Sequence, residues 1–166
     1  MGGLWRMIRN VNLSDTKAVC DIYNYYVENT IVTFDYEQMP IETMEKKIKS
    51  IISEYPWLVF EESGKVLGYA YASKWRSKFA YRYSIESTVY LDPKATGKGI
   101  GSKLYSELFK LLKEQNIRNV FGVIALPNEG SIALHEKFGF EKTGHFKEVG
   151  YKFDKWIDVG YWQLRL

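Results

Sequence analysis

The chain has 166 residues, 46% hydrophobic and 26% charged, a composition typical of one globular domain with a full core. Its 23 basic and 20 acidic side chains are interspersed and give a net charge of +3, so no basic block indicates nucleic-acid binding. One cysteine, Cys20, excludes an intramolecular disulfide and a zinc site built from cysteines, and no run approaches the ~20 apolar residues of a membrane-spanning helix.

Helical and strand-like patterns alternate without repeats or linkers, which predicts one domain over residues 7–166. Residues 1–6 precede it as a short native extension or a cloning remnant. The predicted elements, in chain order, are a strand at 7–12, a helix capped by Ser14 or Asp15, a helix at 41–55, strands at 58–62, 66–73 and 83–91, a helix ending at Gln115, a strand at 119–126, a short helix at about 131–138, and strands around 145–151 and 156–165. The order β-α-α-β-β-β-α-β-α-β-β predicts an α/β (α+β) fold in which helices cover a mixed sheet.

A glycine loop, residues 97–102, lies between a predicted strand and a strongly amphipathic helix. Glycines let the backbone approach an anion, and the free N–H groups of a new helix point at it, so a pyrophosphate is the expected ligand. The loop alone also fits a helix that is simply entered through flexible glycines. A nicotinamide-dependent oxidoreductase also uses such glycines. That class needs an acidic residue after the next strand, and the strand at 119–126 carries no carboxylate.

Six short motifs follow in the order found in a known family. They are Trp75-Arg76, Ala80-Tyr81, Glu86-Ser87-Thr88-Val89-Tyr90, Leu126-Pro127-Asn128, Leu134-His135-Glu136 and Asp158-Val159-Gly160-Tyr161-Trp162-Gln163. Nearly the whole chain resembles the GNAT superfamily of N-acetyltransferases, and most closely its phosphinothricin acetyltransferase subgroup, which includes relatives acting on methionine sulfoximine and methionine sulfone. The resemblance implies the GNAT fold, with a mostly antiparallel sheet of about seven strands, and acetyl-CoA as co-substrate. One position departs from the superfamily pattern, because Thr96 replaces the usual Gln or Arg.

Acetyl transfer to an amine requires a group that takes a proton from the amine, a donor to the carbonyl oxygen, and a proton for the leaving thiolate. Glu86 is a candidate because a carboxylate is costly in a strand of Ser, Thr, Val and Tyr. His135 is the second candidate, since its ring titrates near neutral pH, although its helical spacing with Ile132 and Phe138 also suits a core histidine. The sequence leaves open which of the two is the base.

By resemblance, the strand before the glycine loop is expected to bulge and to splay from its neighbour, which frees the N–H of Val89 or Tyr90 for the carbonyl oxygen. Asn128 is expected to cap the short helix and also to touch the cofactor. The full set of expected cofactor-binding residues is Val89, Tyr90, Leu91, Gly97, Lys98, Gly99, Ile100, Gly101, Ser102, Asn128, Ser131 and Lys137.

The predicted loop at 75–82 concentrates cations and aromatic rings, an arrangement suited to a small anion with an apolar body, although a solvated basic loop has the same composition. With the resemblance, the expected substrate-binding residues are Phe34, Arg76, Lys78, Phe79, Ala80, Tyr81 and Thr88.

Together these features predict a cytoplasmic N-acetyltransferase that acts on a small L-amino acid analogue by direct transfer in a ternary complex, as in herbicide or antibiotic detoxification. No metal, nucleic-acid or membrane partner is expected. The aromatic content of 16%, with Trp156, Tyr161 and Trp162 in the last predicted strand, exceeds what a small core needs. Some of these rings are expected in a subunit contact, and with the resemblance this predicts a homodimer. Two alternatives stay open: a protein or peptide N-acetyltransferase, and a non-catalytic acetyl-CoA-binding sensor.

Overall fold

The structure, a computed structural model, describes residues 5–166. Its elements are β1 (Arg6–Asn10), α1 (Thr16–Asn29), α2 (Ile41–Ile52), β2 (Trp57–Glu62), β3 (Lys65–Lys74), β4 (Ser84–Leu91), α3 (Ile100–Glu114), β5 (Asn119–Leu126), α4 (Glu129–Lys137), β6 (Glu141–Lys152) and β7 (Lys155–Arg165). This confirms the predicted order of strands and helices. Residues 1–4 of the predicted extension lie outside the described residues. Arg6, however, already pairs with Glu62, so the boundary before residue 7 is placed too late.

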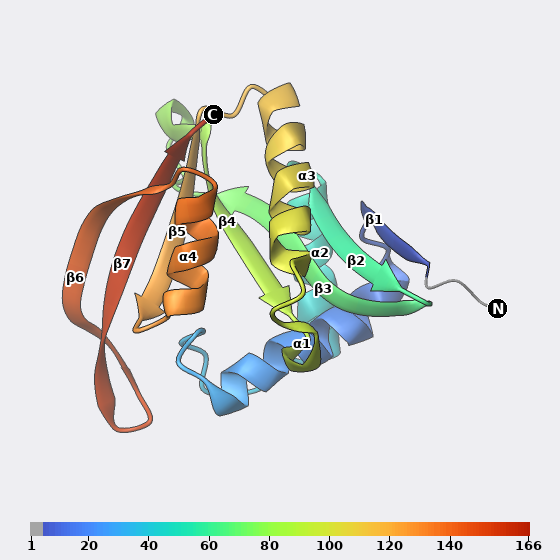
Figure 1. Cartoon of the computed structure of the whole chain (residues 1–166), viewed down its shortest axis with the longest axis horizontal. Helices are drawn as coiled ribbons and strands as arrows, with labels where there is room; N and C mark the ends of the chain where they lie inside the picture. Colours follow the sequence, from blue (N-terminus) through green and yellow to red (C-terminus); the bar gives the residue numbers. More distant parts are fainter. Residues whose placement is uncertain (1–4) are drawn as a thin grey trace.

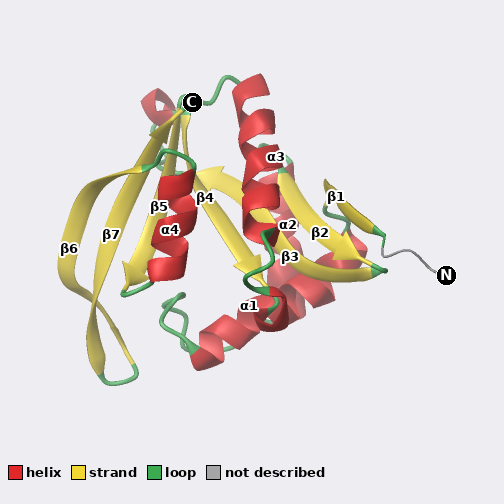
Figure 2. Ribbon diagram, in the orientation of Figure 1, coloured by secondary structure: helices red, strands yellow, loops and turns green. Residues whose placement is uncertain are grey.

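The strands form one sheet in the order β1-β2-β3-β4-β5-β7-β6. Every neighbouring pair is antiparallel except β4 and β5, which confirms a mixed, mostly antiparallel sheet. Helices cover both faces, with α3 and α4 on one and α1 and α2 on the other (Figures 1 and 2). No helix in residues 5–166 is both long enough and apolar enough to cross a bilayer.

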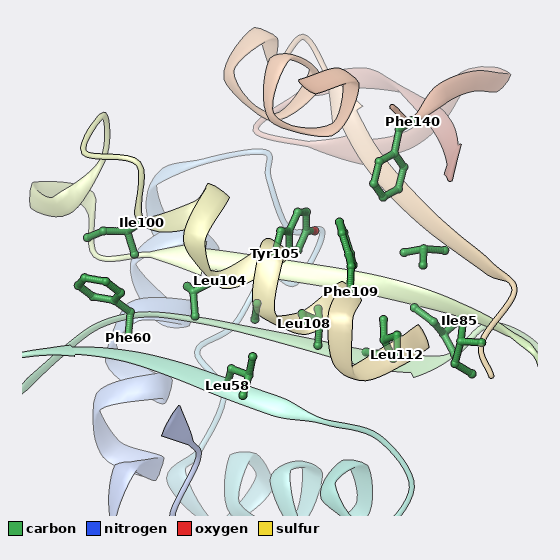
Figure 3. Packing of buried hydrophobic residues seen from close by; sticks show 14 of the residues in the cluster. Leu58, Phe60, Ile85, Ile100, Leu104, Tyr105, Leu108, Phe109, Leu112 and Phe140 are labelled. Carbon is green, nitrogen blue, oxygen red and sulfur yellow. The ribbon is translucent and has the colours of Figure 1, made fainter. Parts of the chain in front are cut away.

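Each face of the sheet has its own hydrophobic core. On one face, Leu104, Leu108 and Leu112 of α3 are fully buried against the strands (Figure 3). On the other, Val19 of α1 and Ile48 of α2 are equally buried. The two amphipathic helix sets therefore fix the sheet between them, since apolar burial is the main stabilising term.

Local details at the first helix differ from the sequence prediction. Asp15 precedes α1 but makes no capping bond to it. Its carboxylate instead accepts two hydrogen bonds from the Arg9 guanidinium, at 2.7 and 2.9 Å, and one from the Asn12 N–H at 2.7 Å. An ion pair between β1 and the turn before α1 has replaced the expected cap, because the Arg9 fork matches carboxylate geometry.

Strands β4 and β5 pair only at one end. Their parallel register covers Ser84–Asn119, Ile85–Val120 and Glu86–Phe121, and beyond these pairs the strands part (Figure 1). β4 stays paired with β3 as far as Leu91 without a register shift. The expected separation of this strand from a neighbour is confirmed, whereas the expected bulge in β4 is wrong. The gap in the sheet is the space between β4, which stays paired with β3, and β5, which stays paired with β7.

Candidate functional site

The gap between β4 and β5 is a cleft of about 260 Å³ that runs through the sheet. Its lining comes from several elements: Glu86 from β4, Val123 from β5, Tyr105 from α3, His135 from α4 and Phe34 from the loop after α1. Since side chains alternate along a strand, β4 supplies both faces of the cleft. Glu86 lies on the α1–α2 side, and the Tyr105 and His135 pair lies on the α3–α4 side.

A second pocket, of about 410 Å³, continues from the cleft to the glycine loop. Val89, Tyr90, Asn128 and Ser131 line both spaces, so the two form one continuous channel. The predicted cofactor-binding residues that line it are Val89, Tyr90, Leu91, Gly97, Gly99, Ile100, Gly101, Ser102, Asn128 and Ser131. The structure therefore brings together most of that set.

The glycine loop has the conformation that anion binding needs. Gly97 and Gly99 have φ angles of +73° and +76°, which disfavour any side chain, and α3 begins at Ile100. The first turn of α3 leaves N–H groups without an intrahelical acceptor, at the positive end of the helix dipole. Thr96 lines the pocket, but its hydroxyl is 3.3 Å from the carbonyl of Pro93 rather than directed at a ligand.

Two predicted cofactor contacts, Lys98 and Lys137, do not line the channel. Lys98 is exposed between the two glycines. Lys137 donates a hydrogen bond to Ser102 Oγ at 3.1 Å, across the mouth of the pocket. Both therefore place positive charge beside the glycine loop. Asn128 does cap α4, as predicted, by accepting a hydrogen bond from the Ser131 N–H at 3.1 Å.

Glu86 has no ion-pair or hydrogen-bond partner within the described part of the chain, and it lines the cleft. Burial raises the pKa of its carboxyl, and the Lys47 ammonium on α2 opposes this more weakly. A half-buried, unpaired carboxylate with a raised pKa is well suited to accept a proton.

His135 is 3% exposed and its two ring nitrogens have different partners. Nδ1 lies 2.7 Å from the carbonyl oxygen of Ser131, which can only accept, so we assign the ring proton to Nδ1. Nε2 then accepts a hydrogen bond from the Tyr105 hydroxyl, 3.3 Å away. Burial lowers the pKa of His135, and the Ser131 carbonyl opposes this more weakly, which favours the neutral form of the ring.

Main-chain geometry at the end of β4 identifies the N–H that faces the gap. The Asp92 N–H donates to the Leu67 carbonyl beside β3, at 2.8 Å, whereas the Leu91 carbonyl points away and accepts from the Tyr26 hydroxyl at 2.6 Å. Because main-chain groups alternate in direction along an antiparallel strand, the N–H of Val89 points away from β3 and into the gap. The N–H of Tyr90 points toward β3.

The basic loop after β3 lies apart from this channel. Trp75, Arg76, Lys78 and Tyr81 line a separate groove. The Arg76 guanidinium is 4.8 Å from the centre of the Trp75 ring, which itself stacks on Phe121 of β5. Phe79 and Ala80 are exposed. Of the predicted substrate-binding residues, the structure places only Phe34 and Thr88 in the cleft with Glu86.

Sequence reasoning missed Tyr105 and Ser87. Tyr105 is a hydroxyl-bearing residue in the otherwise apolar buried face of α3, and that contrast could have identified it. Ser87 is buried in β4, and its hydroxyl has no hydrogen-bond partner among residues 5–166. Val32 and Thr33, in the loop after α1, had no recognisable signal because only the folded chain brings this loop to the cleft.

His145, the second histidine of the chain, is held by Asp158, with Nε2 and Oδ2 2.7 Å apart. Within residues 5–166, no group of three or more His, Cys, Asp or Glu side chains is arranged to hold a metal ion.

A channel with helix N–H groups at one end and an unpaired carboxylate in its wall is the kind of site that acyl transfer requires. Comparisons with known proteins identify the family. Residues 8–160 match the acetyltransferase (GNAT) domain, and the chain belongs to this family of N-acetyltransferases.

Two curated relatives cover almost the whole chain. Phosphinothricin N-acetyltransferase from Streptomyces viridochromogenes is 40% identical over 156 residues, covering 94% of this chain and 85% of the relative. The L-methionine sulfoximine/L-methionine sulfone acetyltransferase of Salmonella typhimurium is 34% identical over 161 residues, covering 96% and 94%.

A solved structure gives the same result. The phosphinothricin acetyltransferase of Sinorhizobium meliloti, crystallised with acetyl-CoA, has a TM-score of 0.94 at 36% identity and covers 97% of this chain and 88% of its own. These findings confirm the family, the subgroup resemblance and the GNAT fold.

Proposed function

We propose that this protein transfers the acetyl group of acetyl-CoA to the amino group of a small L-amino acid analogue of the phosphinothricin, methionine sulfoximine or methionine sulfone type. The observation that carries the proposal is the continuity of the glycine-loop pocket with the cleft that holds the unpaired Glu86 carboxylate. A donor held at one end and a base at the other are what amide formation requires.

The residues present fit a coenzyme A thioester. The N–H groups at the start of α3, together with Lys98 and Lys137, suit the pyrophosphate, while the apolar walls formed by Val89 and Leu134 suit the pantetheine arm. When bound, acetyl-CoA supplies the activated acetyl group.

In the proposed reaction, Glu86 accepts a proton from the acceptor's ammonium group, directly or through water, and so frees the amine. The N–H of Val89 stabilises the negative charge that develops on the carbonyl oxygen as the C–N bond forms. The C–S bond then breaks, the leaving sulfur takes the proton of the Tyr105 hydroxyl, and the newly bonded nitrogen releases its second proton to solvent. His135 orients that hydroxyl, because Nε2 accepts its hydrogen bond. Solvent then restores the proton of Tyr105.

Transfer is proposed to be direct, without an acetylated cysteine. Cys20, the one cysteine of the chain, is buried in α1, and burial raises the pKa of its thiol. It is not among the residues that line the cleft. A thiol so placed is neither ionised nor accessible for attack.

On the acceptor side, Phe34 and Thr88 would contact the apolar body of the acceptor, and Arg76 and Lys78 are proposed to attract its carboxylate toward the cleft. Their groove adjoins β5 next to Glu86, because Trp75 stacks on the Phe121 that pairs with Glu86. Electrostatic attraction of this kind acts over a distance without direct contact.

A homodimer is part of the proposal. Exposed aromatic side chains gather at the end of the β6–β7 hairpin, chiefly Tyr151, Phe153 and Trp156, with the ring centres of Tyr151 and Trp156 4.9 Å apart. An exposed apolar patch of this kind is typical of subunit contacts. Of the three aromatic residues singled out in the last strand, Trp162 is buried in the core and Tyr161 packs on Phe146.

The test is release of CoA thiol from acetyl-CoA by the purified protein, with L-phosphinothricin, L-methionine sulfoximine, L-methionine sulfone and a set of peptides with free N-termini as acceptors. The proposal predicts turnover with at least one amino acid analogue and kcat/KM at least about tenfold below it for every peptide. Preference for peptides would favour a protein acetyltransferase. Binding of acetyl-CoA without turnover of any acceptor would favour a sensor.

A further inference from the structure

The loop after α1 forms one wall of the cleft although it belongs to no helix or strand. Val32, Thr33 and Phe34 line the cleft from this loop. Side chains on an irregular segment keep a fixed position only where other elements hold the segment. Here one anchor is Tyr23 of α1, whose hydroxyl lies 2.8 Å from Thr33 Oγ1. The other anchor is the end of β6.

Lys152, near the end of β6, is 1% exposed, which is unusual for a lysine. Its Nζ donates to the carbonyls of Val27 at 2.7 Å, Thr30 at 2.8 Å and Thr33 at 2.8 Å. An ammonium group has three N–H donors, so all are used. Val27 lies in the last turn of α1, where a positive charge is favoured by the helix dipole. The lysine thus ties the end of this helix to the wall of the cleft.

The two residues before Lys152 also hold the loop. A Cβ at Gly150 would lie 2.4 Å from ring carbons of Phe34, so glycine is required for this close approach. The hydroxyl of Tyr36 donates to the carbonyl of Tyr151. In Figure 1 the loop between α1 and α2 lies between α1 and the β6–β7 hairpin, as these contacts require. Three consecutive residues of β6 therefore contact the loop.

We propose that Lys152 is a positioning residue for acceptor binding. Its ammonium group holds the loop at residues 30–36 so that Phe34 and Thr33 form the acceptor-side wall of the cleft. Lys152 itself touches no reacting atom. The inference rests on the proposed function in one respect, namely that the acceptor binds against this wall of the cleft. The anchoring contacts stand without it.

The experiment compares Lys152→Met, which keeps an unbranched side chain of similar length but removes the charge and donors, with Lys155→Met, at an exposed lysine on the same hairpin. Hydrogen exchange measured by mass spectrometry should show residues 30–36 exchanging at least about tenfold faster in Lys152→Met, with α3 unchanged. The acceptor KM should rise about tenfold while the acetyl-CoA KM stays within about twofold. Lys155→Met should match the wild type in every measurement.

Unchanged exchange at residues 30–36 would overturn the anchoring role, and faster exchange with an unchanged acceptor KM would overturn the role in acceptor binding. If the wild type turns over none of the acceptors but Lys152→Met still loosens the loop, the proposed function fails and the anchor stands. Should Lys152→Met not fold, Gly150→Ala keeps the lysine and displaces Phe34. It should raise the acceptor KM alone, and an unchanged KM would count against the proposal.

Discussion

Glu86 occupies the last position at which β4 still pairs with β5. Its side chain therefore lies where the gap opens, close enough to the core for burial to raise its pKa and open enough to meet a substrate. At the next position of β4, the same side chain would point to the opposite face of the sheet, toward the core under α3.

Replacing Glu86 by glutamine should lower kcat by about 10²–10³-fold, because the amide cannot accept the proton. The dissociation constant for acetyl-CoA should stay within about twofold, since the side chain lies beyond the glycine-loop pocket. Steady-state kinetics and calorimetry measure the two effects, with Glu107→Gln, an exposed position on α3, as the control. Full activity in Glu86→Gln would remove this residue from the mechanism.

The pH dependence of kcat/KM should report the ionisation of Glu86. The carboxyl must be deprotonated to act as base, so activity is lost as pH falls through its pKa, which burial raises above the ordinary value of 4.5. The acceptor should be an amine whose own pKa lies below that of Glu86. The fall in kcat/KM at low pH, the acidic limb, then reports a group of the enzyme. We expect the limb to disappear from the residual activity of Glu86→Gln. A limb that persists there would assign it to another group.

The Tyr105 hydroxyl and His135 form a buried pair whose loss should affect both stability and rate. Tyr105→Phe leaves the imidazole acceptor unpaired and should cost about 1–3 kcal/mol in the free energy of unfolding. It should also lower kcat by at least about tenfold, since the leaving sulfur loses its proton donor. Urea unfolding and thiol release measure these effects, and Tyr25→Phe at an exposed tyrosine should change neither. Unchanged kcat would assign the pair a structural role only.

At the scale of elements, the glycine loop and the turn between β2 and β3 provide a matched pair. Gly99 and Gly64 have similar φ angles, +76° and +79°, and a Cβ at either would meet no atom within 4 Å. Alanine at each position should therefore cost a similar ~1–2 kcal/mol of backbone strain. Only Gly99→Ala should weaken acetyl-CoA binding, by about tenfold, since only this loop is proposed to meet the pyrophosphate. Equal acetyl-CoA affinities in the two variants would contradict that assignment.

The order of elements could be predicted because each has a local signal: the 3.6-residue period of Leu104, Leu108 and Leu112, the apolar runs of the strands, and the turn at Ser63 and Gly64. Strand ends were less accurate. β6 begins at Glu141, before the predicted start near His145, because its first residues pair with β7 and carry little hydrophobic pattern of their own.

The site was only partly predictable. Glu86, His135 and the glycine loop stand out by residue type. Their meeting, by contrast, depends on where β4 and β5 separate, which follows from long-range pairing with β3 and β7. No local pattern indicates that Lys152 reaches the end of α1, because Lys152 and Val27 are 125 residues apart in the sequence.

At the scale of the whole molecule, the exposed face of the β6–β7 hairpin should decide the state of assembly. We expect sedimentation to show a dimer, and Trp156→Glu to shift it to monomer by placing a charge in the contact. Trp5→Glu, at another highly exposed tryptophan beside β1, is the control and should leave the dimer intact. A monomeric wild type at micromolar concentration would refute the dimer.

The central claim is that the gap between β4 and β5 brings the thioester of acetyl-CoA to the Glu86 carboxylate. The most direct measurement is a crystal structure of Glu86→Gln with acetyl-CoA bound. We predict the pyrophosphate against the first turn of α3 and the thioester oxygen about 3 Å from the Val89 nitrogen. A pyrophosphate elsewhere, or an acetyl group resting outside the gap, would contradict the account.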